Sequence, residues 1–338
     1  MVKILFKISG VLLIIASLVL GWLITDIRHF LKTPLEFGGD GVRYIIKPND
    51  SVHSIANSLQ SRGILTKPYY LIGIAKWQRI AGKIKVGEYL IPALITPEEL
   101  LALFVSGDVI QHSLTLIEGW TFDQVLNAVN DSEHLTHTIN EFSTEEIMDR
   151  LGLAGLHPEG RFYPDTYHFT HGTTDIDFLK RAYAQMEKIL AQEWEKKADN
   201  IAVKNPYEAL ILASIIERET SVEAERWEVS GVFTRRLKRN MLLQTDPTVI
   251  YGLGKEFDGN IRRRDLRRDT PYNTYVHKGL PPTPIAMPSA QSIEAALHPD
   301  NGKTIYFVSK GDGTHYFSKT LQEHNDAVRK YQLGGKRK

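Results

Sequence analysis

The sequence predicts an α+β fold made of an N-terminal transmembrane helix, a small α+β subdomain and a larger α+β domain. Three observations support this class. An uncharged apolar run stands near the N-terminus. Short strand-like segments and helices then follow one another without the regular alternation that is typical of a doubly wound parallel sheet. Finally, the 338 residues are 42% hydrophobic, which suits about two packed domains and excludes a wholly disordered chain.

The apolar run covers residues 8–25 and carries no charged side chain. At a rise of about 1.5 Å per residue, a helix of this length spans roughly 27 Å, close to the thickness of the hydrocarbon core of a bilayer. The run is longer than the apolar region of a cleaved signal peptide, and it lacks a small-x-small cleavage site. Because Lys3 and Lys7 lie on its short N-terminal side, we expect residues 1–7 in the cytoplasm and the rest of the chain on the periplasmic side of the inner membrane.

Residues 26–42 contain Pro34 and are predicted to form a linker, and the small subdomain then covers residues 43–109. The expected elements of this region are strands at 42–46 and 89–91, and helices that follow Ser51, run from Pro68 to Ala81, and run from Thr96 to Gly107. The segment YIIKPNDSVHSIANSLQSRGIL resembles the start of a LysM-like module, a small fold that binds N-acetylated glycans. The alternative is a subdomain that only separates the remainder of the chain from the membrane.

The larger domain is predicted to cover residues 110–332, followed by a frayed tail at 333–338. The expected elements, in chain order, are a strand at 112–117, a helix through Val125 and Leu126, two short helical stretches within 131–157 and a long amphipathic helix over 176–197. The loop at 158–167 is dense in aromatic side chains, which either stack on sugar rings or fill a domain junction.

Composition excludes several kinds of chemistry and of partner. The chain has no cysteine, so disulfides, thiolate metal sites and a cysteine nucleophile are excluded. No HExxH cluster and no Gly-rich phosphate loop occurs, and we therefore expect neither a metal site nor an organic cofactor. The 41 Lys and Arg residues against 40 Asp and Glu residues argue against a nucleic-acid partner. The arginine cluster at 262–268 is accordingly predicted to be a solvated surface.

The most informative segment begins at Asn205, which can cap a helix that starts with Pro206. Residues 209–216 have no polar face, so we expect this helix to be buried on all sides. It leads directly into two carboxylic acids, Glu217 and Glu219, which point about 200° apart on a helix. Only one of them can therefore continue a buried stripe.

Glu217 is the acid that follows this stripe, because it lies above Leu210 and Ala213 on the helix. An apolar wall favours the neutral form of a carboxyl group, which is the form that a general acid needs near neutral pH. The alternative is an ion pair between Glu217 and an arginine. The candidates for that arginine are Arg218, Arg235 and Arg236.

Residues 213–220, with the sequence ASIIERET, resemble the signature of the endolytic murein transglycosylase (MltG/YceG-like) family. Further segments typical of the family follow in the same order, so that the resemblance runs from residue 43 to 331. These segments are 243–252, 272–275, 279–282, 298–299, 306–308, 313–315 and 324–325. Two departures occur: Thr234 stands where asparagine often precedes the arginine, and Thr283 stands where glycine is frequent.

The resemblance implies a membrane-anchored lytic transglycosylase that acts on the glycan strands of peptidoglycan. The catalytic glutamate of the family corresponds to Glu217. Protonated Glu217 is expected to donate its proton to the glycosidic oxygen between N-acetylmuramic acid and N-acetylglucosamine. The same carboxylate then accepts the proton of the muramyl C6 hydroxyl group, which attacks C1 and closes a 1,6-anhydro ring. Two alternatives stay open: a hydrolytic muramidase, which needs a second carboxylate, and a non-catalytic protein that binds or scaffolds the cell wall.

Six further residues in these segments are candidates for substrate binding: Gln244, Asp246, Thr248, Tyr251, Asn273 and Tyr275. Asp246 is also the obvious candidate for the second carboxylate of a hydrolase, although a polar residue before Pro247 is ordinary in a turn. Core packing is the alternative role for Tyr275. The family's role further implies peptidoglycan synthases (penicillin-binding proteins) as partners.

Overall fold

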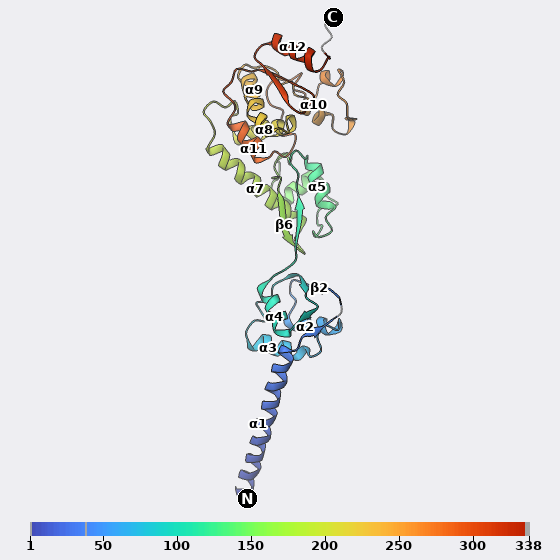
Figure 1. The fold of residues 1–338 in the computed structure, drawn as a ribbon, viewed down its shortest axis with the longest axis vertical. Helices are drawn as coiled ribbons and strands as arrows, with labels where there is room; N and C mark the ends of the chain where they lie inside the picture. Colours follow the sequence, from blue (N-terminus) through green and yellow to red (C-terminus); the bar gives the residue numbers. More distant parts are fainter. Residues whose placement is uncertain (1, 38, 335–338) are drawn as a thin grey trace. The chain divides into compact units, whose positions relative to one another are not determined.

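The computed structural model describes residues 2–37 and 39–334 of a mixed α/β protein (Figure 1). The chain separates into two compact units. The N-terminal unit consists of Met1–His112 with Thr170–Gly172, and the C-terminal unit consists of Ser113–Phe169 with Thr173–Lys338. The sequence had placed the boundary between residues 109 and 110. Of the predicted tail at 333–338, residues 335–338 lie outside the described residues, as do Met1 and Gly38.

Helix α1 (Val2–Lys32) contains the predicted apolar run and continues beyond it. Its part from Phe6 to Lys32 is long and apolar enough to cross a membrane, and this is the one such helix among the described residues. The prediction of a linker at 26–42 does not hold for residues 26–32, because α1 continues past the charged residue Asp26 to Lys32. Phe30 and, from strand β1 (Leu35–Glu36), Leu35 are buried in the core of the N-terminal unit.

The N-terminal unit is built around a β-α-α-β arrangement. Its elements are β2 (Val42–Ile46), α2 (Val52–Ser61), α3 (Pro68–Trp77), β3 (Gly87–Ile91), β4 (Leu94–Ile95) and α4 (Pro97–Ser106). Strands β2 and β3 pair in antiparallel fashion with Tyr44 opposite Tyr89, and β1 pairs with β4. As predicted, Ser51 and Thr96 cap their helices, each in a capping box.

Helix α3 ends earlier than the sequence indicated, at Trp77 instead of Ala81. The physical reason is a left-handed backbone at Arg79, with φ of 57°, which no continuing helix can accommodate. The amide N–H of Ile80 then donates back to the carbonyl oxygen of Ala75 and closes the last turn.

The C-terminal unit carries most of the helices. From residue 111 onward the elements, in chain order, are β5 (Gln111–Thr115), α5 (Phe122–Asn130), α6 (Thr144–Leu151), β6 (Thr166–Thr170), α7 (Asp175–Glu195), α8 (Pro206–Glu219), η1 (Glu223–Glu225), α9 (Arg226–Lys238), α10 (Asp246–Leu253), η2 (Gly254–Glu256), η3 (Asp265–Arg267), α11 (Ala290–Leu297), β7 (Tyr306–Ser309), β8 (His315–Ser318) and α12 (Leu321–Tyr331). Strand β5 pairs with β6, and β7 pairs with β8. Within 131–157 the structure has one helix, α6, where the sequence predicted two short helical stretches.

Helix α8 is the centre of the C-terminal unit (Figure 1). Every residue from Ala209 to Ile216 is buried, as the absence of a polar face predicted. The side chain of Asn205 caps the helix by accepting a hydrogen bond from the N–H of Glu208. Helices α7, α9, α10 and α11 pack around α8. This packing brings Glu217 and Glu219, at the C-terminal end of α8, against residues that lie far away in the sequence.

Candidate functional site

Glu217 lies at the end of α8 and faces the start of α11. Its Oε2 atom accepts three hydrogen bonds, from the Ser289 N–H at 2.9 Å, the Ser289 hydroxyl at 2.5 Å and the Ser292 hydroxyl at 2.7 Å. Ser289 is the N-cap of α11, so the first turn of that helix also directs its positive end toward the carboxylate. The predicted apolar wall at Glu217 is therefore wrong, because α11 supplies polar groups that periodicity within α8 cannot reveal.

Arg226 is the cation beside Glu217. Its Nη2 atom lies 3.6 Å from Oε1 of Glu217, and the two side chains are only 9% and 7% exposed. The sequence had indicated Arg218, Arg235 or Arg236 for this ion pair. Arg218 instead donates to the carbonyl oxygen of Gly119, and Arg235 and Arg236 bind the backbone at Asp300, Thr304 and Ile305.

The Nε–H donor of Arg226 is distinct from the nitrogen that faces Glu217. This Nε–H group is buried and has no hydrogen-bond partner among the described residues. A buried donor without an acceptor is unfavourable, so such a group in a native protein commonly marks a place where another molecule supplies the acceptor. The open donor lies on the same side chain that contacts Glu217.

A second carboxylic acid, Glu118, lies beside Glu217 although it is far away in the sequence. Burial and the negative charge of Glu217 raise the pKa of Glu118, and Arg226 opposes this shift. The following residue, Gly119, has a left-handed backbone with φ of 76°, and its N–H donates to the carbonyl oxygen of Met287 at 2.8 Å. This bond holds the Glu118 loop against the segment that leads to α11.

Glu219, two residues beyond Glu217, has the environment that the sequence predicted for Glu217. Burial raises the pKa of Glu219 to about 7, and the negative charge of Asp246 contributes to the shift. The hydroxyl group of Thr245 donates to Glu219 at 2.5 Å and partly offsets it. Two acids on one helix end thus differ in kind: Glu217 has polar partners and a cation, while Glu219 is desolvated.

A cavity of about 380 Å³ opens beside Glu219. Three of the predicted binding residues line it, namely Gln244, Asp246 and Tyr275. The Tyr275 hydroxyl group donates to Asp246 at 2.6 Å, and Arg236 donates to the side chain of Gln244 at 3.2 Å. The structure therefore brings these three side chains together around Glu219.

Thr248 and Asn273 have partners within the protein. The Thr248 hydroxyl group donates to the carbonyl oxygen of Thr245 at 2.8 Å. The side-chain amide of Asn273 donates to the carbonyl oxygens of Asp265 and Arg268 and accepts from the N–H of Tyr275. Both side chains are buried and hold the loops around the cavity in place, and their role in substrate binding stays a prediction.

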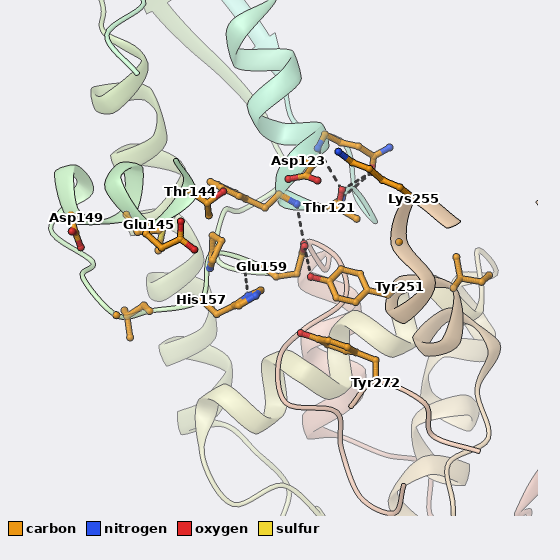
Figure 2. A pocket seen from close by; sticks show the side chains of 18 residues that line it. Thr121, Asp123, Thr144, Glu145, Asp149, His157, Glu159, Tyr251, Lys255 and Tyr272 are labelled. Atoms are coloured by element: carbon orange, nitrogen blue, oxygen red, sulfur yellow. Dashed lines mark hydrogen bonds between the residues drawn. The ribbon is translucent and has the colours of Figure 1, made fainter. Parts of the chain in front are cut away.

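Tyr251 lines a different and larger cavity, of about 900 Å³. Figure 2 shows that Tyr251 and Glu159 point toward one another in this cavity, and the Tyr251 hydroxyl group donates to Glu159 at 3.0 Å. Glu159 also accepts from the N–H of Phe122 at 3.0 Å, and burial raises its pKa to about 7. Sequence reasoning missed Glu159, although it belongs to the aromatic loop that the sequence singled out.

Among the residues that the structure describes, no group of three or more His, Asp or Glu side chains could hold a metal ion. The groups that surround Glu217 are carboxyl, hydroxyl and guanidinium groups. Two adjacent carboxylic acids in different environments, next to an open arginine donor, can transfer a proton and stabilise a charge.

The profile of the YceG-like family matches residues 44–330, and the chain belongs to this family. The endolytic murein transglycosylase of Bacillus subtilis is 38% identical over 211 residues, which cover 62% of this chain and 58% of that protein. The endolytic murein transglycosylase of Streptococcus pneumoniae is 25% identical, over 89% of this chain and 61% of that protein. The chain thus spans less than two thirds of the length of these curated relatives. A crystal structure of a YceG-like protein from Listeria monocytogenes has a TM-score of 0.54 at 26% identity, and the match covers 86% of this chain and 99% of that one.

Proposed function

We propose that this protein is a lytic transglycosylase that cleaves the glycan strands of peptidoglycan within the strand. The named activity of the relatives and the family membership support this proposal. The observation that carries it is the site at the end of α8, where Glu217 lies between the serine hydroxyl groups of α11 and the open guanidinium donor of Arg226.

We assign the proton transfers to Oε1 of Glu217. Three donors already occupy Oε2, whereas Oε1 has the ion-pair contact with Nη2 of Arg226, at 3.6 Å. The protonated carboxyl donates to the glycosidic oxygen as the bond between that oxygen and the muramyl C1 breaks. The C6 hydroxyl oxygen then bonds to C1 and gives its proton back to Glu217, so the carboxyl is regenerated and no water is consumed. Because the nucleophile belongs to the same sugar, an effective molarity of about 10⁵ M or more can replace an activated water.

The neighbours of Glu217 have complementary tasks in this proposal. The Nε–H group of Arg226 donates to a substrate oxygen, which would satisfy its unpaired donor. The hydroxyl groups of Ser289 and Ser292 can both donate and accept, so they can follow Glu217 between its ionised and neutral forms. Glu118 is the second carboxyl group of the site, and burial together with the negative charge of Glu217 raises its pKa.

The presence of Glu118 favours one other candidate, a hydrolytic muramidase, because hydrolases use two carboxyl groups. Mass spectrometry of digested strands separates the two reactions. The transglycosylase produces 1,6-anhydro-muramyl ends, which are lighter than hydrolysed ends by one water. Exclusive production of hydrolysed ends would overturn the proposal.

We further propose that α1 anchors the protein in the inner membrane, with residues 1–7 in the cytoplasm and both units on the periplasmic side. Its length and apolar composition support the anchor. The β-α-α-β order of the N-terminal unit supports a LysM-like glycan contact. Peptidoglycan synthases, the penicillin-binding proteins, are the proposed partners. Protease accessibility in sealed inverted membrane vesicles tests the orientation, because their outer face is the cytoplasmic face. The C-terminal unit should be protected there, and its digestion would be the contrary result for this topology.

A further inference from the structure

A groove of about 520 Å³ lies between α1 and α3 in the N-terminal unit. Its apolar walls are Ile24, Ile27 and Leu31 of α1 and Tyr69, Ile74 and Trp77 of α3. We propose that this interface groove binds an acyl chain of a membrane phospholipid, with Tyr69 and Trp77 at the level of the headgroups. The proposal rests on the membrane anchoring proposed above and adds a lipid site to it.

The position of the groove along α1 supports a lipid as the occupant. Helix α1 has 31 residues, which correspond to about 46 Å, whereas the hydrocarbon core of a bilayer is about 30 Å thick. Several turns of α1 must therefore emerge from the core. The groove begins at Ile24, where the uncharged run ends, so its apolar walls directly follow the membrane-spanning part of α1.

The aromatic side chains of the groove are unusually exposed. Tyr69 is 60% exposed and Trp77 is 84% exposed, although both are large and largely apolar. The two residues are eight positions apart on one face of α3, and Gly73 lies between them. Tyrosine and tryptophan with this exposure are typical of the membrane–water interface, where the ring is in an apolar layer and its polar atom is hydrated.

Basic residues surround the same end of α3. Lys76 and Arg79 are exposed next to Trp77, and Arg28 contributes to the rim of the groove from α1. Positive side chains at this depth attract anionic headgroups, and their aliphatic stems can lie along the acyl region. The charges thus match a phospholipid whose headgroup lies at the rim and whose chain fills the groove.

The groove is formed by the fold itself, because contacts at one end of α3 attach this helix to α1. Asp26 of α1 accepts hydrogen bonds from Lys67 at 3.0 Å and from the Tyr70 hydroxyl group at 2.5 Å. Phe30 of α1 is buried in the core of the unit and packs edge-on against Tyr70 at 5.5 Å between ring centroids. These contacts hold α3 against α1 and set the spacing of the two walls of the groove.

Spin labels in the full chain test the proposal, because the chain has no cysteine and each introduced cysteine is unique. The chain is placed in nanodiscs of phosphatidylcholine and phosphatidylglycerol. Three single-label variants are compared for exposure of the label to lipid-soluble oxygen and to a water-soluble nickel chelate. The label positions are Gln78→Cys in the groove, Leu18→Cys in the middle of α1 and Leu90→Cys on β3. Strand β3 pairs with β2, which Figure 1 shows farther from α1 than α3 is.

We expect the label at position 78 to follow that at Leu18 in favouring oxygen, and the label at Leu90 to favour nickel. If position 78 favours nickel while Leu18 favours oxygen, the groove is not a lipid site, although the anchor stands. If Leu18 also favours nickel, the anchor and the groove proposal both fail. Spin–spin coupling between two chains at position 78 would assign the groove to a second copy and overturn the proposal.

Filling the groove from within gives a second test. A side chain at Gly73 meets open space, so Gly73→Leu blocks the groove without a clash and removes an unfavourable helical glycine. The matched control is Gly10→Leu, which makes the same change at an open position of α1 outside the groove. We expect the amount of phospholipid that stays bound after detergent washing to be about tenfold lower in Gly73→Leu. A tenfold change corresponds to about 1.4 kcal/mol of binding free energy, which is the size of the apolar contact that the leucine displaces. Equal retention in the two variants would refute a lipid in the groove.

Discussion

Replacing Glu217 by glutamine removes both the proposed proton donor and the counter-charge of a buried arginine. The Glu217 side chain is 7% exposed and Arg226 is 9% exposed, so the positive charge of Arg226 would stay buried without its ion-pair partner, with Glu118 as the acid that remains nearby. Removing one member of a buried ion pair costs about 3–5 kcal/mol. Since the 3.6 Å separation exceeds hydrogen-bond length, we expect the lower end, about 3 kcal/mol of unfolding free energy.

Activity should fall more steeply than stability. One group acts first as the acid and then as the base, and each such transfer is worth about 10²–10⁴ in rate. We therefore expect Glu217→Gln to form anhydro-muramyl ends at least about 10³-fold more slowly than the unmodified protein. Mass spectrometry of the digested strands measures this rate, and denaturant titration in detergent measures the stability.

Two further variants separate the ion pair from the chemistry. The double variant Glu217→Gln with Arg226→Met removes both charges, so it should regain most of the lost stability and still be inactive. Glu219→Gln is the control for stability, because Glu219 has no ion pair within the described part of the chain and burial raises its pKa to about 7; we expect this variant not to lower the unfolding free energy at neutral pH. A rate of strand cleavage in Glu217→Gln equal to that of the unmodified protein would refute the assignment of the acid. An unfolding free energy equal to that of the unmodified protein would refute the ion pair.

Three other predictions concern groups that the sequence did not indicate. Burial raises the pKa of Glu159 from 4.5 to about 7, so between these pH values the folded protein binds a proton that the unfolded chain does not. The stability that this proton contributes is complete below about pH 4.5 and is lost as the pH rises through 7. The total loss is up to about 3 kcal/mol of unfolding free energy. Glu159→Gln should flatten the stability between pH 5 and pH 8, and equal slopes in melting experiments on both proteins would contradict this. Burial and the charge of Glu217 raise the pKa of Glu118, so Glu118→Gln should remove the ionisation of Glu118 from the pH–rate profile; an unchanged profile would show that Glu118 does not affect the reaction. Phe162 is fully buried, and Phe162→Ala should lower the unfolding free energy by about 3–5 kcal/mol in denaturant titrations. The exposed Leu333→Ala serves as its control, with a change below about 0.5 kcal/mol.

Helix α8 shows how far sequence reasoning reached. The cap at Asn205, the proline at Pro206 and the all-apolar run are local signals, and each is present in the structure. The mistake concerned the surroundings of the two acids, because the three-dimensional neighbours of Glu217 and Glu219 come from α9, α11 and the loop before α10. Periodicity along one helix shows which residues share a face, but not what is packed against that face.

Several predictions that rest on the sequence alone are therefore confirmed. The apolar N-terminal run, the helix caps at Ser51 and Thr96, and the family signature at 213–220 depend only on neighbouring residues and on their order. These signals predicted the membrane helix candidate, most of the helices and the family to which the chain belongs.

Only the tertiary structure decided the partners of each acid. It placed Arg226, Ser289 and Ser292 on Glu217, and it brought Glu118 to the same site from about a hundred residues away. It also separated the six predicted binding residues, so that Tyr251 faces Glu159 while three others surround Glu219. The physical reason is that hydrogen bonding and burial depend on contacts between distant segments, and no local pattern in the sequence encodes those contacts.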